Sequence, residues 1–477
     1  MHRDMDALKE NLEQAKVENR LLEYMGEELK HGMELAQLWE IHSYFHELPE
    51  EAFQNNAYLA SHMTHVCVLE GDLETAKRYM EYTKSNPKIY EFTRVFYPAL
   101  TNNEFRQAIE DLYQRKSGVP QDMVLTAVRP TLINGFRDFT LYGEILPKLK
   151  HRYEEVMPAL YGDVAGIVYK IACAELLYQR NECFEALVIV VSAIQEMKES
   201  TDIRCLLVAK ALEMYILVLN GQVQSAELIT NKLRRRIEQL KNHGLEKNLD
   251  ALEVFAAMYD GHTELINHWM LNGAPDEFND FNMLDTYRYT IKMRCYLLQK
   301  KHMALLSLGE TLIPLLESTY RTMDVCEIRM LIAMCYHDQK KNDLAFDMMD
   351  GVLRTAELYR YDRLIGDEGD RMYRLLYDYR KVRGNSPYLK RVMDIAKQVG
   401  MAHPNYLKMQ YSNAENLSEV EQNVLRLMAE EHSNAEIGMM LDIALNTVKF
   451  HAKNIYKKLS VNSRGQAVKK AKELGIL

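Results

Sequence analysis

The sequence predicts an all-α protein, in which helical hairpins repeat about every 40 residues and a four-helix domain follows them. Three observations support this fold class. Gly (21) and Pro (11) are scarce in the 477 residues, which favours long helices joined by short turns. A turn motif recurs along most of the chain, and residues 417–477 carry several closely spaced signals for helix starts.

The turn motif consists of a small or polar residue followed, five positions later, by alanine. The best copies are Gly71–Ala76, Asn103–Ala108, Asn181–Ala186, Gly221–Ala226 and Lys340–Ala345, and weaker copies begin at Gly32, Gly143, Gly261 and near Lys300. We expect the first residue of each copy to end a helix in the left-handed conformation. The alanine should let the next helix approach its neighbour closely.

From residue 181 onward the motif starts about every 40 residues, which is enough for two helices of roughly 15 residues and their turns. An all-α protein with unrelated glycine turns is the alternative, but the constant spacing favours a stack of hairpins. Residues 1–402 are therefore predicted to form one helical repeat domain. The curved surface of such a domain commonly docks proteins or small ligands.

Residues 403–416 are largely polar and lack a helical pattern of apolar residues, so they are predicted to be a linker. Residues 417–477 contain nine Lys/Arg and seven Asp/Glu, a net charge of +2. The rest of the chain therefore carries −11 of the total charge of −9. Only the field of the C-terminal domain would attract phosphates.

Three capping boxes mark the starts of helices in the C-terminal domain: Ser418 with Glu421, Ser433 with Glu436, and Ser463 with Gln466. The remaining helix is predicted to extend from Thr447 to Leu459, after a tight turn at 442–445. Together these signals predict four short helices.

The helix at 447–459 has two distinct faces. Val448 and Ile455 lie on the face predicted to be buried, whereas Lys449, Lys453 and Lys457 follow each other at intervals of four residues on another face. A run of lysines is usually a solvated helix face. Here it lies on the second helix of a helix-turn-helix, which favours contacts to DNA phosphates and guanine edges in the major groove.

The pattern of this domain resembles the LuxR-type DNA-binding domain. The residues that match are Leu417, Glu421, Leu425, Asn434, Glu436, Ile437, Leu441, Ile443, Thr447, Val448, Lys449, His451, Ile455, Lys458, Leu459, Val461, Arg464, Gln466, Ala467 and Val468. The resemblance implies that the helix with Thr447 reads the major groove of double-stranded DNA, as part of a homodimer. The DNA-binding residues that it implies are Thr447, Lys449, Phe450, Lys453, Asn454, Lys457 and Arg464.

Four positions depart from the family pattern. Val420 replaces an arginine, Glu431 a glycine and Ala435 a lysine. Ala444 stands where a serine or threonine normally caps the recognition helix. Loss of a cap costs about 1 kcal/mol, so the domain is expected either to be marginally stable or to be capped by Asn446 instead.

The preceding domain resembles the tetratricopeptide-like region of the MalT-like regulators, through the segments 46–51, 71–79 and 366–369. Those regulators also carry a nucleotide-binding module, but no G-x-x-x-x-G-K-[ST] motif occurs in this sequence. Neither ATP-gated switching nor a bound cofactor is therefore expected.

Other chemistry has little support in the sequence. His62 and His65 could share a helix face, but they have no evident third metal ligand, so no metal site is expected. The acids Asp367 and Glu368 are interpreted as part of a helix start. No catalytic motif occurs, and we do not expect an enzyme.

We expect a cytoplasmic protein, because no apolar run is long enough to cross a membrane and seven scattered cysteines suit a reducing compartment. The favoured hypothesis is a transcription regulator, in which the repeat domain senses an unknown protein or small-molecule effector and the C-terminal domain binds promoter DNA. The alternative is an interaction scaffold whose C-terminal domain has lost useful affinity for DNA.

Overall fold

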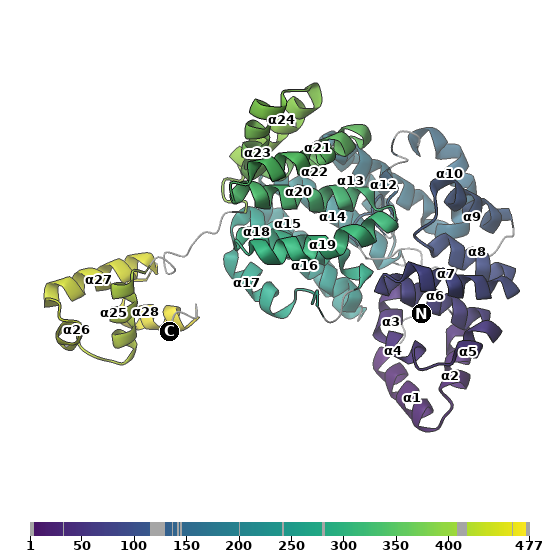
Figure 1. Cartoon of the computed structure of the whole chain (residues 1–477), viewed down its shortest axis with the longest axis horizontal. Helices are drawn as coiled ribbons and strands as arrows, with labels where there is room; N and C mark the ends of the chain where they lie inside the picture. Colours follow the sequence, from purple (N-terminus) through teal and green to yellow (C-terminus); the bar gives the residue numbers. More distant parts are fainter. Residues whose placement is uncertain are drawn as a thin grey trace. The chain divides into compact units, whose positions relative to one another are not determined.

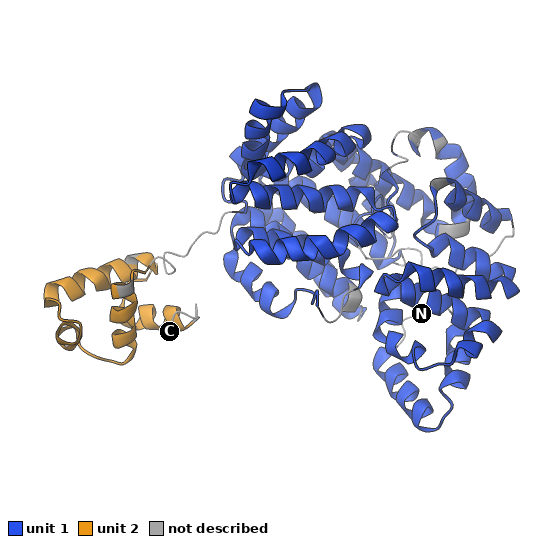
Figure 2. Cartoon of the chain, viewed as in Figure 1, with its two compact units in different colours: residues 1–408 blue, residues 409–477 orange. Residues whose placement is uncertain are grey.

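The computed structural model describes residues 4–473 except 32, 115–128, 136, 141–142, 144–145, 200, 241–242, 279–281, 408–416 and 460. The chain divides into two compact units, residues 1–408 (the body) and residues 409–477 (the tail), as Figure 2 shows. Within the described residues there is no strand, and the only bridge joins Asn134 to Asp138. The predicted all-α class is confirmed. None of the described helices is both long and apolar enough to span a bilayer.

The first part of the body is built from short helices that share a core around Phe45, Phe53 and Leu59. These helices are α1 (Met5–Val17), α2 (Leu21–Glu28), α3 (Leu35–Glu40), α4 (His42–Phe45), α5 (Glu50–Asn55), α6 (Ala57–Glu70), α7 (Leu73–Tyr82), α8 (Pro87–Phe96), α9 (Asn102–Gln114), α10 (Lys150–Val156) and α11 (Pro158–Tyr161). The 3₁₀ turns of the body are η1 (Leu29–His31), η2 (Thr83–Ser85), η5 (Leu146–Leu149), η6 (Gly162–Val164) and η7 (Met283–Asp285).

Helical hairpins form the second part of the body (Figure 1). Their helices are α12 (Ala165–Gln179) with α13 (Cys183–Glu196), α14 (Ile203–Leu219) with α15 (Val223–Gln239), α16 (His243–Asp260) with α17 (Thr263–Asn272), α18 (Thr286–Leu298) with α19 (His302–Ser318), and α20 (Thr322–Asp338) with α21 (Asn342–Tyr359). The first helix of each hairpin packs against the first helix of the next. The body ends with α22 (Asp362–Gly366), α23 (Gly369–Arg383) and α24 (Pro387–Ala402).

The turns inside these hairpins keep the predicted spacing. Asn181, Gly221, Gly261, Lys300 and Lys340 follow one another at intervals of 39 or 40 residues, and all have a positive φ, between 57° and 80°. In each turn the next residue donates its N–H to a carbonyl five residues back, which closes the end of the first helix. The repeat period of about 40 residues is therefore confirmed.

The alanine of the motif is buried where the motif is well formed, because the two helices of a hairpin meet there. Ala186, Ala226 and Ala345 are 0% exposed. In the two intervening hairpins Ile266 and Leu305 take this position and are also buried.

The copy at Asn103 is an exception. Asn103 lies in the first turn of α9 and does not end a helix. Thr101 instead caps the start of α9, because its hydroxyl accepts the N–H of Glu104 and the Glu104 carboxylate accepts the N–H of Thr101. Gly32, another predicted copy, lies outside the described residues.

The predicted linker 403–416 begins too early. Residues 403–407 belong to the body, since the ring of Tyr406 stacks on that of Tyr259 with centroids 4.1 Å apart and Leu407 is also buried. The segment is largely polar, but the burial of Tyr406 and Leu407 holds its first residues against the body. The composition of the segment alone did not predict this contact. Residues 408–416 lie outside the described residues.

The tail consists of α25 (Glu419–Ala429), α26 (Asn434–Met440), α27 (Leu445–Lys458) and α28 (Arg464–Glu473). It has a core of its own, to which all four helices contribute: Leu417, Val424, Leu425, Met428, Ile437, Val448, Ala452, Ile455, Leu459, Ala467 and Ala471. The tail is therefore a separate small domain.

Candidate nucleic-acid interface and interior pocket

Capping boxes fix the first two helices of the tail. The hydroxyls of Ser418 and Ser433 accept the N–H groups of Glu421 and Glu436, and each glutamate accepts the N–H of its serine at 2.7 Å. Both predicted boxes are confirmed. They satisfy amides that would otherwise be unpaired at the helix start.

The start of α28 carries a variant of the capping box. Ser463 accepts the N–H of Gln466 at 3.3 Å, but the side-chain oxygen of Gln466 accepts the N–H of Asn462 instead of that of Ser463. The next residue, Arg464, donates to the carbonyls of Met428 and His432 at 2.9 and 2.6 Å. Arg464, predicted to bind DNA, is thus engaged in holding α28 against the end of α25.

The recognition helix α27 has the two predicted faces. Val448 and Ile455 are 0% exposed, whereas Lys449, Phe450 and Lys453 are exposed. Phe450 is unusual, because 62% of this large apolar side chain is exposed. We call Lys449, Phe450 and Lys453 the recognition face.

The other predicted DNA-binding residues of α27 are less clearly placed on this face. Thr447 and Asn454 are half-buried. Lys457 lies in α27, but its side chain is outside the described part of the structure.

A tight turn sets α27 against α26. Asp442 has a φ of 53°, and the N–H of Ile443 donates to the carbonyl of Gly438 at 2.9 Å. A Cβ atom on Gly438 would lie 2.8 Å from the Ile443 carbonyl oxygen, so this position needs glycine. Sequence reasoning missed Gly438, although a glycine inside a capped helix was a usable signal.

Helix α27 begins at Leu445, two residues before the predicted start at Thr447, so Ala444 directly precedes it. Its carbonyl accepts the N–H groups of Thr447 and Val448, but its methyl side chain offers no oxygen to the open amides of the first turn.

An ion pair connects the first and third helices of the tail. Lys458 donates to the Glu421 carboxylate at 2.5 Å, and Glu421 is only 3% exposed. Burial opposes the ionisation of Glu421, but the hydrogen bonds from Lys458 and Ser418 outweigh it and hold the pKa of Glu421 below its usual value. The back of α27 is thereby fixed to the capping box of α25.

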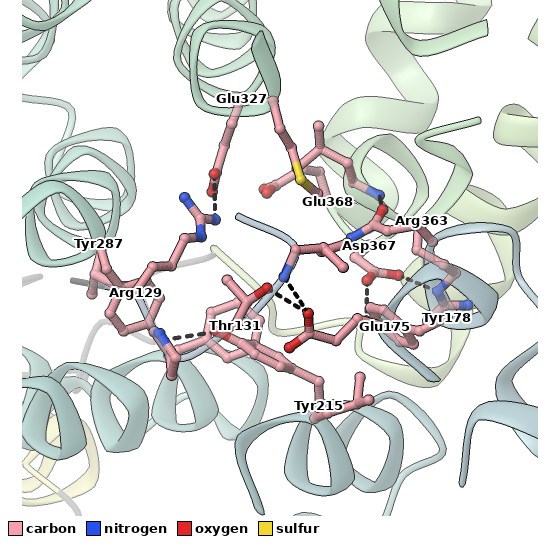
Figure 3. A pocket seen from close by; sticks show the side chains of 18 of the residues that line it. Arg129, Thr131, Glu175, Tyr178, Tyr215, Tyr287, Glu327, Arg363, Asp367 and Glu368 are labelled. Atoms are coloured by element: carbon pink, nitrogen blue, oxygen red, sulfur yellow. Dashed lines mark hydrogen bonds and ion pairs between the residues drawn. The ribbon is translucent and has the colours of Figure 1, made fainter. Parts of the chain in front are cut away.

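The body contains a pocket of about 100 Å³ that both apolar and charged side chains line (Figure 3). The first helices of the hairpins, α22 and residues 129–133 line it. Its aromatic side chains are Tyr178, Tyr215, Phe255, Tyr259 and Tyr287, and its charged side chains are Arg129, Glu175, Arg294, Glu327, Arg363, Asp367 and Glu368. The volume is enough for several water molecules.

A network of buried ion pairs and hydrogen bonds connects this pocket with the last residues of the body. Arg129 and Arg294 donate to the two oxygens of Glu327, at 2.5 and 2.8 Å. Arg294 also donates to Glu368 at 2.5 Å, and the Tyr406 hydroxyl donates to the other oxygen of Glu368 at 2.9 Å. The network joins residues that are far apart in the sequence.

The prediction that Asp367 and Glu368 mark a helix start gives the right position, since α23 begins at Gly369, but the two carboxylates do not cap the helix. Glu368 precedes α23 but makes no side-chain capping bond, because its carboxylate faces Arg294. Asp367 accepts from the hydroxyl of Tyr178 and pairs with Arg363. Burial raises the pKa of Asp367 to about 6 in spite of these partners.

Residues 131–133 are held by a buried carboxylate. Glu175 accepts the N–H of Leu132 at 2.9 Å, the N–H of Ile133 at 2.7 Å and the hydroxyl of Thr131 at 2.9 Å. Burial outweighs these hydrogen bonds and raises the pKa of Glu175 to about 7. The backbone of this segment thus forms one wall of the pocket.

The two histidines considered as metal ligands are interior residues of α6. Burial, and then the neighbouring His62, lower the pKa of His65 to about 3. Among the described residues no group of three or more His, Cys, Asp or Glu side chains could hold a metal ion.

Comparison with known proteins finds a match within each of the two units. Residues 162–382 match the MalT-like TPR region, and residues 415–471 match the bacterial regulatory proteins of the luxR family. The chain is 40% identical over 62 residues to the regulatory protein SdiA of Escherichia coli, which is 13% of this chain and 26% of SdiA.

The tail is also similar to the response regulator protein VraR of Staphylococcus saprophyticus and of Staphylococcus aureus. Each is 42% identical over 64 residues, which is 13% of this chain and 31% of VraR. The chain therefore spans less than a third of the length of these relatives. It combines a MalT-like TPR region with a C-terminal domain of the luxR family of bacterial regulatory proteins.

Proposed function

We propose that this protein is a cytoplasmic transcription regulator, without enzymatic activity, that binds promoter DNA through the recognition face of α27. The observation that carries the proposal is the exposure of Lys449, Phe450 and Lys453 together on the second helix of a helix-turn-helix. The match of the tail to luxR-family regulators supports the same role.

The chemistry of the recognition face suits the major groove. The ammonium groups of Lys449 and Lys453 can donate to phosphates or to guanine O6 and N7. The exposed ring of Phe450 can contact the methyl group of a thymine. The close turn at Gly438 and the Glu421–Lys458 ion pair hold the helix in place, so that little ordering is needed when DNA binds.

We propose further that the protein binds DNA as a homodimer and that the repeat body is the sensor or docking platform for a protein or small-molecule effector. The interior pocket supports a sensing role for a very small ligand, because aromatic and charged side chains converge on a volume of about 100 Å³. The network from Arg129 to Tyr406 would link the pocket to the residues that lead to the tail.

The experiment that tests the proposal starts with selection of bound sequences from genomic fragments by the purified full-length protein. The dissociation constant for a selected duplex is then measured at four salt concentrations, with a shuffled duplex of equal length as the control. We expect a preference for the selected sequence and a steep salt dependence, with a slope of roughly −0.9 per neutralised phosphate. A shallow slope without sequence preference would instead favour the scaffold with an inactive tail.

A further inference from the structure

A second concave site lies at the C-terminal end of the body, separate from the interior pocket. It is a groove of about 410 Å³ at the starts of α19, α21 and α23, which we call the basic groove. Lys300, His302, Lys340, Arg371 and Arg374 are among the side chains that line it.

Positive charge exceeds negative charge in the basic groove. Its two acids are already paired, Asp338 with Arg371 at 3.3 Å and Asp370 with Arg374 at 2.9 Å. In contrast, the ammonium groups of Lys300 and Lys340 make no ion pair with any described residue. The two lysines are therefore available for an anion.

The backbone at these two lysines is unusual for their residue type. The equivalent turns of the first three hairpins carry Asn181, Gly221 and Gly261, which suit a positive φ. Lys300 and Lys340 adopt the same conformation, with φ of 57° and 62°, although a lysine side chain disfavours it. Tyr320 and Arg360 adopt a similar conformation elsewhere in the body, so it places the two lysines at these turns without marking a function by itself.

Two further features favour an anion. The side chain of His302 lines the groove, and its Nε2 atom has no hydrogen-bond partner in the described part of the chain. This atom is covered from solvent, so the ring has to turn slightly before it can donate to a ligand in the groove. Lys300 and Lys340 also lie just before α19 and α21, and the open N–H groups at the start of a helix attract negative charge.

We propose that the basic groove binds the phosphate group of a small phosphate monoester. The phosphate supplies acceptor oxygens for both lysines and for His302, and charge-assisted bonds of this type are strong. The volume is far larger than one ion needs and lies in the range of small-molecule sites, roughly 300–1,000 Å³. The remaining space would hold the organic part of the ester. The site goes beyond the proposed DNA binding and does not depend on it.

Matched double variants test the proposal by calorimetric titration of the full-length protein. Lys300→Asn with Lys340→Asn removes both groove lysines, whereas Lys301→Asn with Lys341→Asn removes the same charge one residue later. Asparagine suits both places, since it tolerates a positive φ and is also a good helix cap. The probes are phenyl phosphate and inorganic phosphate, with chloride at equal ionic strength as the control.

We expect phenyl phosphate to bind more tightly than inorganic phosphate. The 300/340 pair should lose affinity about tenfold or more while its melting temperature does not fall, and the 301/341 pair should bind like the wild type. Absence of binding beyond the chloride control, or an equal loss in both pairs, would overturn the site. Equal binding of the two probes would overturn its assignment to an ester.

Discussion

The hydroxyl of Tyr406 donates a 2.9 Å hydrogen bond to the buried carboxylate of Glu368. The other oxygen of that carboxylate accepts from Arg294, and the Tyr406 ring stacks on Tyr259. Tyr406 lies at the end of the described body, immediately before the segment that leads to the tail. This residue pair therefore connects the interior charge network to the chain segment that leads to the luxR-family domain.

Removal of the Tyr406 hydroxyl tests how strongly this contact holds the body together. Tyr406→Phe should lower the free energy of unfolding by about 1–3 kcal/mol, because a buried carboxylate loses a donor. Urea denaturation of the full-length protein measures the change. The control is Tyr377→Phe at a ring that is 39% exposed, which should have little effect. Equal effects of the two variants would show that the Glu368 contact contributes nothing specific.

The hairpin repeat could be predicted from the sequence because its determinants are local. The motif joins a residue that adopts a positive φ to an alanine only five positions later, as in Asn181–Ala186 and Gly221–Ala226. Each capping box of the tail spans only four residues and could be predicted in the same way.

The interior network could not be predicted in this way. Arg294 and Glu368 are 74 positions apart, and Arg129 and Glu327 are 198 apart. Their meeting depends on how many hairpins stack and on the path of residues 129–133, which no local pattern records. A buried acid such as Glu368 therefore looked like an ordinary residue at a helix start.

Glu431 stands where the family pattern has glycine, at a backbone conformation that suits glycine better. Glu431 follows α25 with a φ of 68°, and its N–H and that of His432 donate back to α25. Glu431→Gly should therefore stabilise the tail by about 1 kcal/mol. Thermal melts of the fragment 409–477, which has its own core, measure the gain.

The neighbouring residue supplies the control for this variant. Glu430 has a φ of −81°, so Glu430→Gly only adds backbone freedom and should destabilise the fragment, by roughly 0.5–1 kcal/mol. If both glycine variants lowered the melting temperature, the backbone at Glu431 would not be strained in the folded tail, and the prediction would be wrong.

A side-chain cap can be introduced at the start of α27. Ala444→Ser should raise the free energy of unfolding of the same fragment by about 0.5–2 kcal/mol, because the serine oxygen can accept an open amide of α27. Chemical denaturation measures it. The control Leu445→Ser places a serine one residue inside the helix, at a side chain that is 44% exposed. A gain from both serines, or from neither, would argue against a missing cap.

The stability of the tail should depend on pH through Glu421. Its pKa is lowered in the folded state, so its contribution is fully present above the ordinary value of 4.5 and is lost as the pH falls through the lower folded value. Between pH 6 and pH 3 the wild-type fragment should lose more stability than Glu421→Gln, which cannot titrate at this position. Parallel curves for the two proteins would contradict this assignment.

Single substitutions can separate base contacts from phosphate contacts on the recognition face. Lys449→Ala and Lys453→Ala should each weaken binding to a selected duplex by about 1–3 kcal/mol, while exposed Lys472→Ala on α28 serves as the control. A lysine that contacts a phosphate lowers the steepness of the salt dependence by about one when it is removed, and it weakens binding to all sequences alike. A lysine that contacts a base leaves the salt dependence nearly unchanged and relaxes the preference at one base pair.

Because Val448 and Ile455 form the opposite, buried face, neither alanine should change the melting temperature of the tail. Unchanged affinity in both variants would remove this face of α27 from the interface, and the exposed Phe450 would then need another explanation.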